Sequence, residues 1–253
     1  MCQHRSLWAN ISRACSSSSI SVVITLAFVT SACGSQVPED VLEIIRAIDA
    51  GDTPRLKGLL EGGAVPTPEG SPLSPFHAAI THFHNGQLVC DSAAVKLLLD
   101  HGADPSFVDQ WSGFSALEDA LAMGDIACAA LLKDGGADVN RHGNSGQSYL
   151  QFAVKGALRT GDTRILKLVL SWGVGPNVLS DGRMFTALHE AVWALPTQAE
   201  TAEAVIAELL SSGADPCIAN SDGNTPLDVA ANLGRAASIQ ARLSDAMNGC
   251  ARD

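Results

Sequence analysis

Apolar residues recur three and four positions apart along most of the chain, and no stretch shows sustained strand-like alternation. Leu227, Ala230 and Ala231 illustrate the spacing, which places them on one face of a helix. The segments 93–99 and 163–170 repeat it and are each soon followed by a glycine, a residue suited to closing a helix. The pattern therefore predicts a series of short amphipathic helices joined by turns.

Two short motifs recur within this pattern. One is a glycine turn after a pair of large aliphatic residues, as in LLDHGADP and LLSSGADP, and the other opens an apolar helix, as in TALHEA and TPLDVA. The spacing from one helix-opening motif to the next is uneven, since the copies start at Ser74, Ser115, Ser148, Thr186 and Thr225. The chain is therefore built from repeats of uneven length.

The uneven length has a simple location. The separation between the glycine that joins the two helices and the glycine after the second helix is the same in three repeats, Gly51–Gly63, Gly124–Gly136 and Gly161–Gly173. We therefore expect the extra residues in the loop between the two helices of a repeat, around 82–91, 156–160 and 194–200. Insertions confined to one loop leave the stacking surfaces of a repeat intact.

The helix-opening motif resembles that of the ankyrin repeat, T-P-L-H-x-A with a period of about 33 residues. Thr186–Ala191 and Thr225–Ala230 match it best. The resemblance implies an all-α repeat solenoid of about six stacked helix pairs including caps, with short β-turn or hairpin connections and inserted inter-helix loops. Val41–Gly63 is the expected first pair and Leu227–Met247 the last. Ser or Thr at the first motif position is expected to cap each first helix.

The segment 1–32 differs in composition from the rest of the chain. It contains Arg5 and Arg13 but no acidic residue, and a serine run precedes the apolar stretch Ile20–Val29. Such a stretch rises about 15 Å as a helix, roughly half the hydrocarbon core of a bilayer. A basic start followed by a short apolar core and small residues is typical of a secretory signal.

The sequence VTSAC, which ends at Cys33, resembles the lipobox of bacterial lipoproteins. Ser31 and Ala32 fit that motif, whereas Thr30 stands where a large apolar residue is usual. The resemblance implies a lipidated Cys33, and Gly34 rather than Asp after it implies an outer-membrane lipoprotein facing the periplasm. Ordinary cleavage, giving a soluble periplasmic or secreted protein, is the alternative. The expected organisation is a signal (1–32), lipidated cysteine and tether (33–40), repeat domain (41–248) and tail (249–253).

The net charge limits the kinds of partner that the protein is expected to bind. The chain has a net charge of −11, and without the two arginines of the signal it carries 14 basic and 27 acidic residues, a balance of −13. Such a field disfavours nucleic acid and favours a basic protein partner.

Four cysteines of the repeat region and tail can pair in an oxidising periplasm, although none has metal-finger spacing: Cys90, Cys128, Cys217 and Cys250. The helical face around Cys128 favours a buried, inert thiol there.

The sequence gives little support for a metal site or for catalysis. His77, His82 and His84, with Cys90 or Asp91, offer metal-ligand types. However, His77 and His189 occupy the motif position at which ankyrin repeats use histidine to brace neighbouring repeats, so we predict no metal site and no cofactor. No G-x-S-x-G elbow, dinucleotide fingerprint or Walker loop occurs, and we predict that the protein is not an enzyme.

The resemblance instead implies binding through the concave face of the first helices and the tips of the turns. Phe152 and Trp193 are the expected aromatic anchors, with packing beneath the inserted loops as the alternative. The predicted partner-binding residues are Asp109, Trp111, Asp119, Arg141, Phe152, Lys155, Arg183, Glu190, Trp193 and Asp222.

The predicted function is a monomeric, non-catalytic scaffold that is lipid-anchored in the bacterial envelope and binds a protein as an immunity or accessory factor. The first alternative is an exported effector that acts on a host protein. The second is a metal-binding or enzymatic envelope protein that uses the 82–91 insertion.

Overall fold

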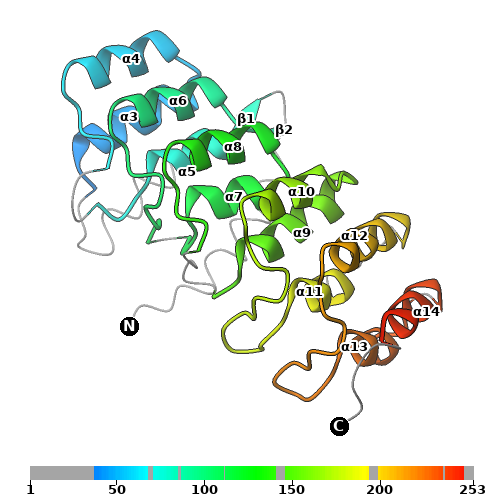
Figure 1. Cartoon of the computed structure of the whole chain (residues 1–253). Coiled ribbons are helices and arrows are strands. Elements are labelled where there is room, and N and C mark those ends of the chain that lie inside the picture. The colour runs from blue at the N-terminus through cyan, green and yellow to red at the C-terminus, as the bar shows by residue number, and fades with distance from the viewer. Residues whose placement is uncertain are drawn as a thin grey trace.

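The computed structural model describes residues 37–67, 71–84, 87–110, 112–140, 146–193, 199–235 and 237–247. Over these residues the chain forms six consecutive helix pairs, with the first helices in one layer and the second helices in another (Figure 1). The predicted all-α repeat solenoid is thereby confirmed. The pairs are α3 (Glu39–Asp49) with α4 (Thr53–Glu61), α5 (Pro75–Ile80) with α6 (Ser92–Asp100), α7 (Ala116–Ala122) with α8 (Ile126–Asp134), α9 (Tyr149–Thr160) with α10 (Arg164–Ser171), α11 (Ala187–Trp193) with α12 (Ala199–Ser211), and α13 (Pro226–Asn232) with α14 (Ala237–Ala246).

One continuous hydrophobic core runs through the array, from Val37 before α3 to Leu243 in α14. Each first helix packs on the next first helix, and each second helix on the next second helix. This arrangement follows from the repeats, because one helix pair exposes apolar faces that only its neighbours can cover. None of the helices in the described part of the chain is long and apolar enough to cross a membrane.

The first helix closes one end of the core. Helix α3 buries Val41, Ile44 and Ile48. Its polar face carries Arg46, whose guanidinium lies 2.9 Å from the carboxylate of Glu39. A charged outer face of this kind keeps the end of a solenoid in water rather than open to further stacking.

The first helices begin where the motif predicts. The hydroxyls of Ser115, Ser148 and Thr225 accept backbone N–H groups of their helices, and the third helical residue returns the bond in each case. These capping boxes satisfy N–H groups that have no partner inside a helix. Aspartates cap second helices by accepting backbone N–H groups, without a returned bond: Asp91 caps α6 and Asp125 caps α8, a role that the sequence analysis did not predict.

The insertion at 82–91 forms a β-hairpin. Strand β1 (His82–His84) pairs antiparallel with β2 (Gln87–Val89), with His82 opposite Val89. Strand β1 also contacts α3, so the hairpin reaches back over the first helix pair. The side chains of 82–88 lie outside the described part of the structure. The predicted loop insertion is therefore present here, as a hairpin.

The insertion at 156–160 is not a loop, and that prediction was wrong. These residues extend α9, which has 12 residues where α7 has seven, and the helix ends at Gly161 with φ of 77°. The extension fits because residue 156 is glycine: a Cβ there would lie 2.0 Å from the backbone oxygen of Leu121. Most of the third predicted insertion, 194–200, lies outside the described residues, and its last two residues belong to α12, which begins at Ala199.

Two arginines tie first helices to the repeat before them. The guanidinium of Arg159, in the extension of α9, donates to the backbone oxygens of Ala122 and Met123 at the end of α7. Arg235 donates to the oxygens of Val192 and Trp193 at the end of α11, at 3.1 and 3.0 Å. Both cations therefore satisfy carbonyl groups at a helix C-terminus, where the helix dipole also favours positive charge.

Candidate functional site

Three aromatic rings gather on α11 and the turn that precedes it. The ring of Phe185 stacks on His189 at a centroid distance of 5.2 Å and meets Trp193 edge-on at 5.9 Å. Phe185 and His189 are buried, whereas Trp193 is 46% exposed. Trp193 therefore stands at the surface on a buried aromatic base, which holds it in place.

A cation covers this aromatic pair. The guanidinium carbon of Arg183 lies 4.9 Å from the ring centroid of Trp193 and 5.8 Å from that of Phe185. These are cation–π distances, which suit a planar guanidinium. Arg183 itself is exposed.

The residue between the cation and the buried phenylalanine has an unusual backbone. Met184 is 44% exposed and has φ of 52°, and it is the one residue other than glycine with positive φ in the described ranges. The left-handed region costs a side-chain-bearing residue roughly 1–2 kcal/mol. We call Arg183, Met184, Phe185 and Trp193 the α11 cluster.

A charged pair lies between α9 and α11, next to this cluster. The ammonium of Lys155 donates to Gln147 at 2.7 Å and lies 3.6 Å from the carboxylate of Glu190. Burial raises the pKa of Glu190, more than the nearby charges of Lys155 and Arg183 lower it. Glu190 is thus a buried carboxyl that helps to join two repeats.

Phe152 is buried, but the contact that covers it comes from another repeat and not from an inserted loop. It is 4% exposed and packs edge-on against Phe114, with centroids 5.7 Å apart. The ammonium of Lys155 lies 5.1 Å above its ring. Phe152 therefore packs inside the array rather than standing as an open anchor.

The remaining predicted binding residues differ in their burial and contacts, and some lie outside the described residues. Asp109 is 3% exposed and accepts the N–H groups of Ser74 and Ser112, so it shapes the turn. Asp119 is bound to His77, and Asp222 is exposed. Trp111, Arg141 and the proposed lipidation site Cys33 lie outside the described residues. Of the predicted set, the structure brings together Phe152, Lys155, Glu190, Arg183 and Trp193.

The sequence analysis missed Met184 and Phe185. The signal was present in the turn SDGRMF, which carries two large apolar residues where the equivalent turn SDGNT is polar. Positive φ at a methionine, however, cannot be inferred from sequence, since glycine is the residue expected there.

The two motif histidines brace neighbouring repeats, as the resemblance implies, but in opposite protonation environments. His77 Nδ1 lies 2.7 Å from a carboxylate oxygen of Asp119, 42 residues further on. Burial lowers the pKa of His77, but the hydrogen bond to Asp119 and the charges of Asp119 and Asp109 outweigh it, so the pKa is raised. His189 Nδ1 accepts from Thr186, and Nε2 donates to the backbone oxygen of Asn224. Burial lowers the pKa of His189 more than the bond to Asn224 raises it.

We expect an NMR titration to place the pKa of His77 above the ordinary value of about 6.5, and that of His189 below it. Asp119→Asn should lower the pKa of His77 and leave the pKa of His189 unchanged.

The raised pKa of His77 also makes stability depend on pH. Because the folded-state pKa of His77 is raised, its contribution to stability is fully present below about pH 6.5 and is lost as pH rises through the folded value. The stability difference between wild type and Asp119→Asn should therefore shrink as pH rises. A His77 pKa below that of His189 would contradict the assignment.

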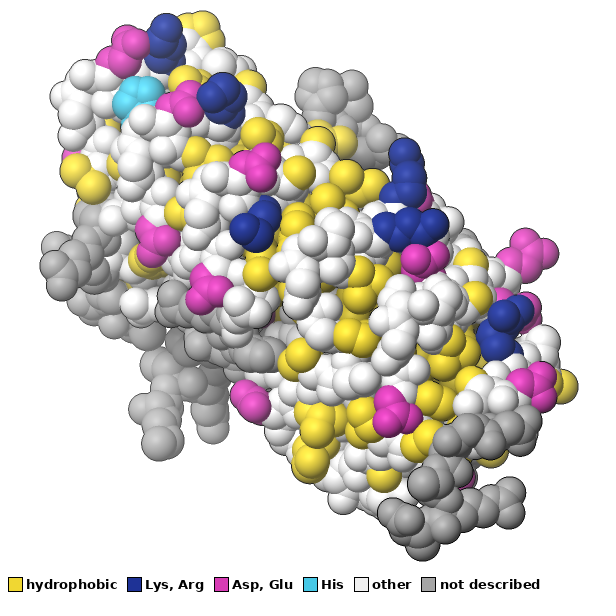
Figure 2. All heavy atoms as spheres, viewed as in Figure 1, with side chains coloured by type: hydrophobic (Ala, Val, Ile, Leu, Met, Phe, Trp, Pro, Cys, Tyr) yellow, Lys and Arg dark blue, Asp and Glu magenta, His cyan; other side chains and the backbone are white. Residues whose placement is uncertain are grey.

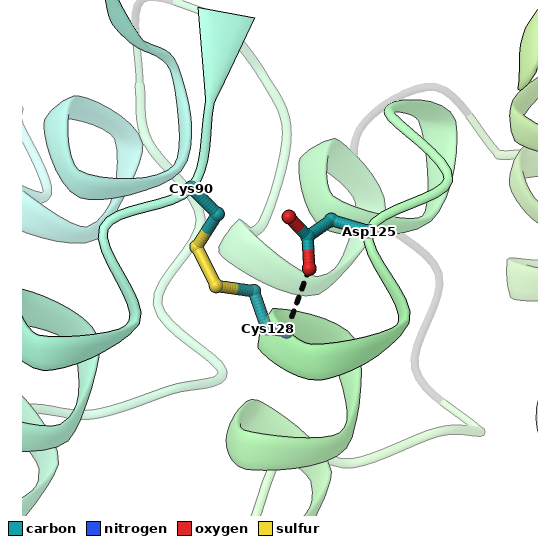
Figure 3. Close-up of side chains that lie close together, drawn as sticks. All are labelled: Cys90, Asp125 and Cys128. Carbon is teal, nitrogen blue, oxygen red and sulfur yellow. Dashed lines mark hydrogen bonds between the residues drawn. A yellow bond between two sulfur atoms is a disulfide. The ribbon is translucent and has the colours of Figure 1, made fainter. Parts of the chain in front are cut away.

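A disulfide joins the second and third helix pairs. Cys90, just after β2, is bonded to Cys128 in the first turn of α8, with Cα atoms 6.5 Å apart (Figure 3). The prediction of an inert thiol at Cys128 was therefore wrong, because the hairpin brings Cys90 beside α8. Cys217 is also disulfide-bonded.

The same place contains a group of potential metal ligands. The sulfurs of Cys90 and Cys128 and a carboxylate oxygen of Asp125 lie within 4.8 Å of one another. Figure 3 shows why this is not a thiolate site in the present state: the two sulfurs are bonded to each other, and Asp125 accepts the backbone N–H of Cys128 at 3.0 Å. Thiolate, not disulfide sulfur, is the metal ligand.

Charge is mixed on the face seen in Figure 2. Lys and Arg side chains lie among Asp and Glu over its upper and right-hand parts, only scattered Asp and Glu are seen at its lower left, and hydrophobic side chains lie between them. That face offers no large patch of one sign of the kind that binds a nucleic-acid backbone.

Residues 73–110 match the family model described as ankyrin repeat. None of the curated proteins compared with the chain matches it. Among solved structures, EF0377, an ankyrin repeat protein, is similar with a TM-score of 0.65 and 24% identity, covering 83% of this chain and 98% of that one. An ankyrin repeat domain from Acinetobacter baumannii AYE is similar with a TM-score of 0.63 and 24% identity, covering 80% and 96%. The family model therefore matches one segment of the array, and the solved structures show that the chain shares the ankyrin-repeat fold.

Proposed function

We propose that the protein is a non-catalytic scaffold that is held in the bacterial envelope by a lipid on Cys33 and binds a protein partner. The observation that carries the binding role is Trp193, which is 46% exposed on a first helix with Arg183 stacked over it. Tryptophan and arginine are the residues most enriched where interfaces concentrate their binding energy. Ankyrin repeats also generally mediate protein binding, in keeping with this role.

Export is supported by two independent features. The first is the basic and then apolar segment before Cys33, and the second is the disulfide between Cys90 and Cys128. Disulfides form and persist in oxidising compartments such as the bacterial periplasm. Because α3 begins at Glu39, the tether is shorter than the expected 33–40: Ser35 to Pro38 spans at most about 14 Å, which would keep the first repeat close to the lipid surface.

The overall charge supports a basic partner. A balance of −13 outside the signal would steer a cationic protein toward the array and speed its encounter. Immunity against a delivered toxin and support of an envelope enzyme both fit an exported, acidic scaffold of this kind.

One crossed experiment tests both parts of the proposal. The tagged full chain, Cys33→Ala and Trp193→Ala are produced in a Gram-negative host, membranes are separated, and the tag is used to capture bound protein. We expect Cys33→Ala to move to the soluble fraction and still capture its partner. Trp193→Ala should stay in the membrane and lose the partner, because truncating a central aromatic residue commonly costs about 2 kcal/mol or more, roughly 30-fold in affinity.

Val65→Ala is the matched control, since Val65 is also an exposed hydrophobic residue, 50% exposed, but lies after the first helix pair. If Cys33→Ala stays in the membrane, the proposed lipid anchor on Cys33 is wrong. If Trp193→Ala captures as much partner as Val65→Ala, the proposed binding surface around Trp193 is wrong. Recovery of the native chain from the culture medium would favour the exported effector instead.

A further inference from the structure

We propose that the α11 cluster is a carboxylate-binding subsite, which takes an Asp or Glu side chain of the partner next to an apolar one. This inference rests on the proposed protein-binding function and names the chemistry that the partner must present. It depends on three observations: the unused donors of Arg183, the strained exposure of Met184, and the charges around them.

The guanidinium of Arg183 contacts aromatic rings. It lies over Trp193 and Phe185, while its N–H groups have no hydrogen-bond or ion-pair partner among the residues that the structure describes. An arginine carries five N–H donors in a planar fork that matches a carboxylate in a bidentate manner. The cation–π contacts restrict the position of the guanidinium in advance, which lowers the entropy lost when a ligand binds.

The turn that carries the arginine is itself anchored. The backbone N–H of Asp181 donates to the oxygen of Gly146 at 2.8 Å, and Ser221 donates to the oxygen of Arg183 at 3.0 Å. Each bond links the turn to the equivalent turn of a neighbouring repeat. Arg183 thus projects from a backbone that is fixed on both sides.

Met184 supplies the apolar neighbour. All the other positive-φ positions in the described ranges are glycines, which adopt that conformation without steric cost. The Met184 side chain is 44% exposed and is not part of the hydrophobic core cluster. Strain of this kind accumulates at ligand-binding sites. Met184 and Trp193 would then flank the bound carboxylate with apolar surface.

The neighbouring charges favour an anion at this point. Lys155 is already engaged by Gln147 and Glu190, and Glu190 is buried. The side chain of Asp181 lies against Gly146, because a Cβ at 146 would approach its carboxylate to 2.8 Å. Arg183 therefore keeps its N–H donors available, although its charge also acts on the buried carboxyl of Glu190 and the chain as a whole is acidic. A basic partner steered by the overall field would dock by placing a carboxylate here.

A displayed library of random short peptides, selected on the purified chain without its signal, tests the proposal. We expect enrichment of Asp or Glu beside Leu, Met or an aromatic residue. Arg183→Gln should weaken the selected peptide by about tenfold or more, in line with loss of a charge-assisted hydrogen bond. Arg183→Lys should not restore it, because an ammonium lacks the fork.

A double-mutant cycle gives the decisive readout. Replacing the peptide's Asp by Asn should cost as much as Arg183→Gln, and the two changes together should cost little more than either alone. Met184→Gly should weaken binding while raising the melting temperature, because glycine relieves the strain; this separates binding from folding.

Three outcomes overturn the proposal: no enriched peptide, enrichment without acidic residues, or additive losses in the cycle. Arg183-dependent binding to phosphatidylglycerol vesicles in place of peptide would also overturn it. If selection fails while capture through Trp193 succeeds, the subsite is wrong and the proposed function stands. If both fail, the face itself is wrong.

Discussion

Gly156→Ala is expected to lower the free energy of unfolding by about 3 kcal/mol, at the upper end of the usual cost of overpacking. The added Cβ would lie 2.0 Å from the backbone oxygen of Leu121 and 2.8 Å from the backbone nitrogen of Gly124. Both atoms belong to main chain, so no side chain can move aside, and α9 must shift away from α7. Urea unfolding should show a lower midpoint, and the melting temperature should fall by roughly 6–12 °C.

Gly58→Ala provides the matched control. Gly58 lies inside α4, and a Cβ there would meet nothing within 4 Å. Alanine at this position should stabilise the protein by about 0.5–1 kcal/mol, because glycine is the poorer helix former. If Gly156→Ala is as stable as Gly58→Ala, α9 does not approach α7 as closely as the structure shows.

The fold was predictable because its signals are local and repeated. Helices start at Ser115, Ser148 and Thr225 because a hydroxyl side chain at that position can accept backbone N–H groups of the first turn. Turn glycines such as Gly102 mark where helices end. Six helix pairs follow from counting these signals. The fate of 156–160 was not predictable in this way, because a glycine inside a helical pattern normally lowers the expectation of helix. Only the approach of Leu121 and Gly124 shows why Gly156 belongs in α9.

The candidate site was predictable only in part. Motif position correctly places Trp193 at the surface, but the same rule places Phe152 there, and Phe152 packs against Phe114. The difference arises from neighbours in other repeats, which a repeat motif does not encode. The stacking of Arg183 on Trp193 likewise joins a turn to a helix end. Such pairings depend on tertiary geometry rather than on the spacing of residues.

The interface between the second and third helix pairs is reinforced twice. The Cys90–Cys128 disulfide ties the hairpin to α8, and the His77–Asp119 pair ties α5 to α7. In a solenoid, stability is approximately the sum of repeat and interface contributions. Loss of a cross-link here should therefore act on one junction rather than evenly along the array.

Replacing both Cys90 and Cys128 by serine is expected to lower the free energy of unfolding by about 4 kcal/mol, the chain-entropy value for a loop closed over 38 residues. Non-reducing peptide mapping of the wild type should recover the Cys90–Cys128 link. Dithiothreitol is a poor substitute for the variant, because it also reduces the disulfide of Cys217. Reduction of the double-serine variant therefore isolates that second contribution.

Hydrogen exchange should show protection falling in α3–α6 before α9–α14, because the first two helix pairs lose their covalent tie to the rest. Even loss of protection along the array, or unchanged stability, would show that the disulfide does not reinforce this junction.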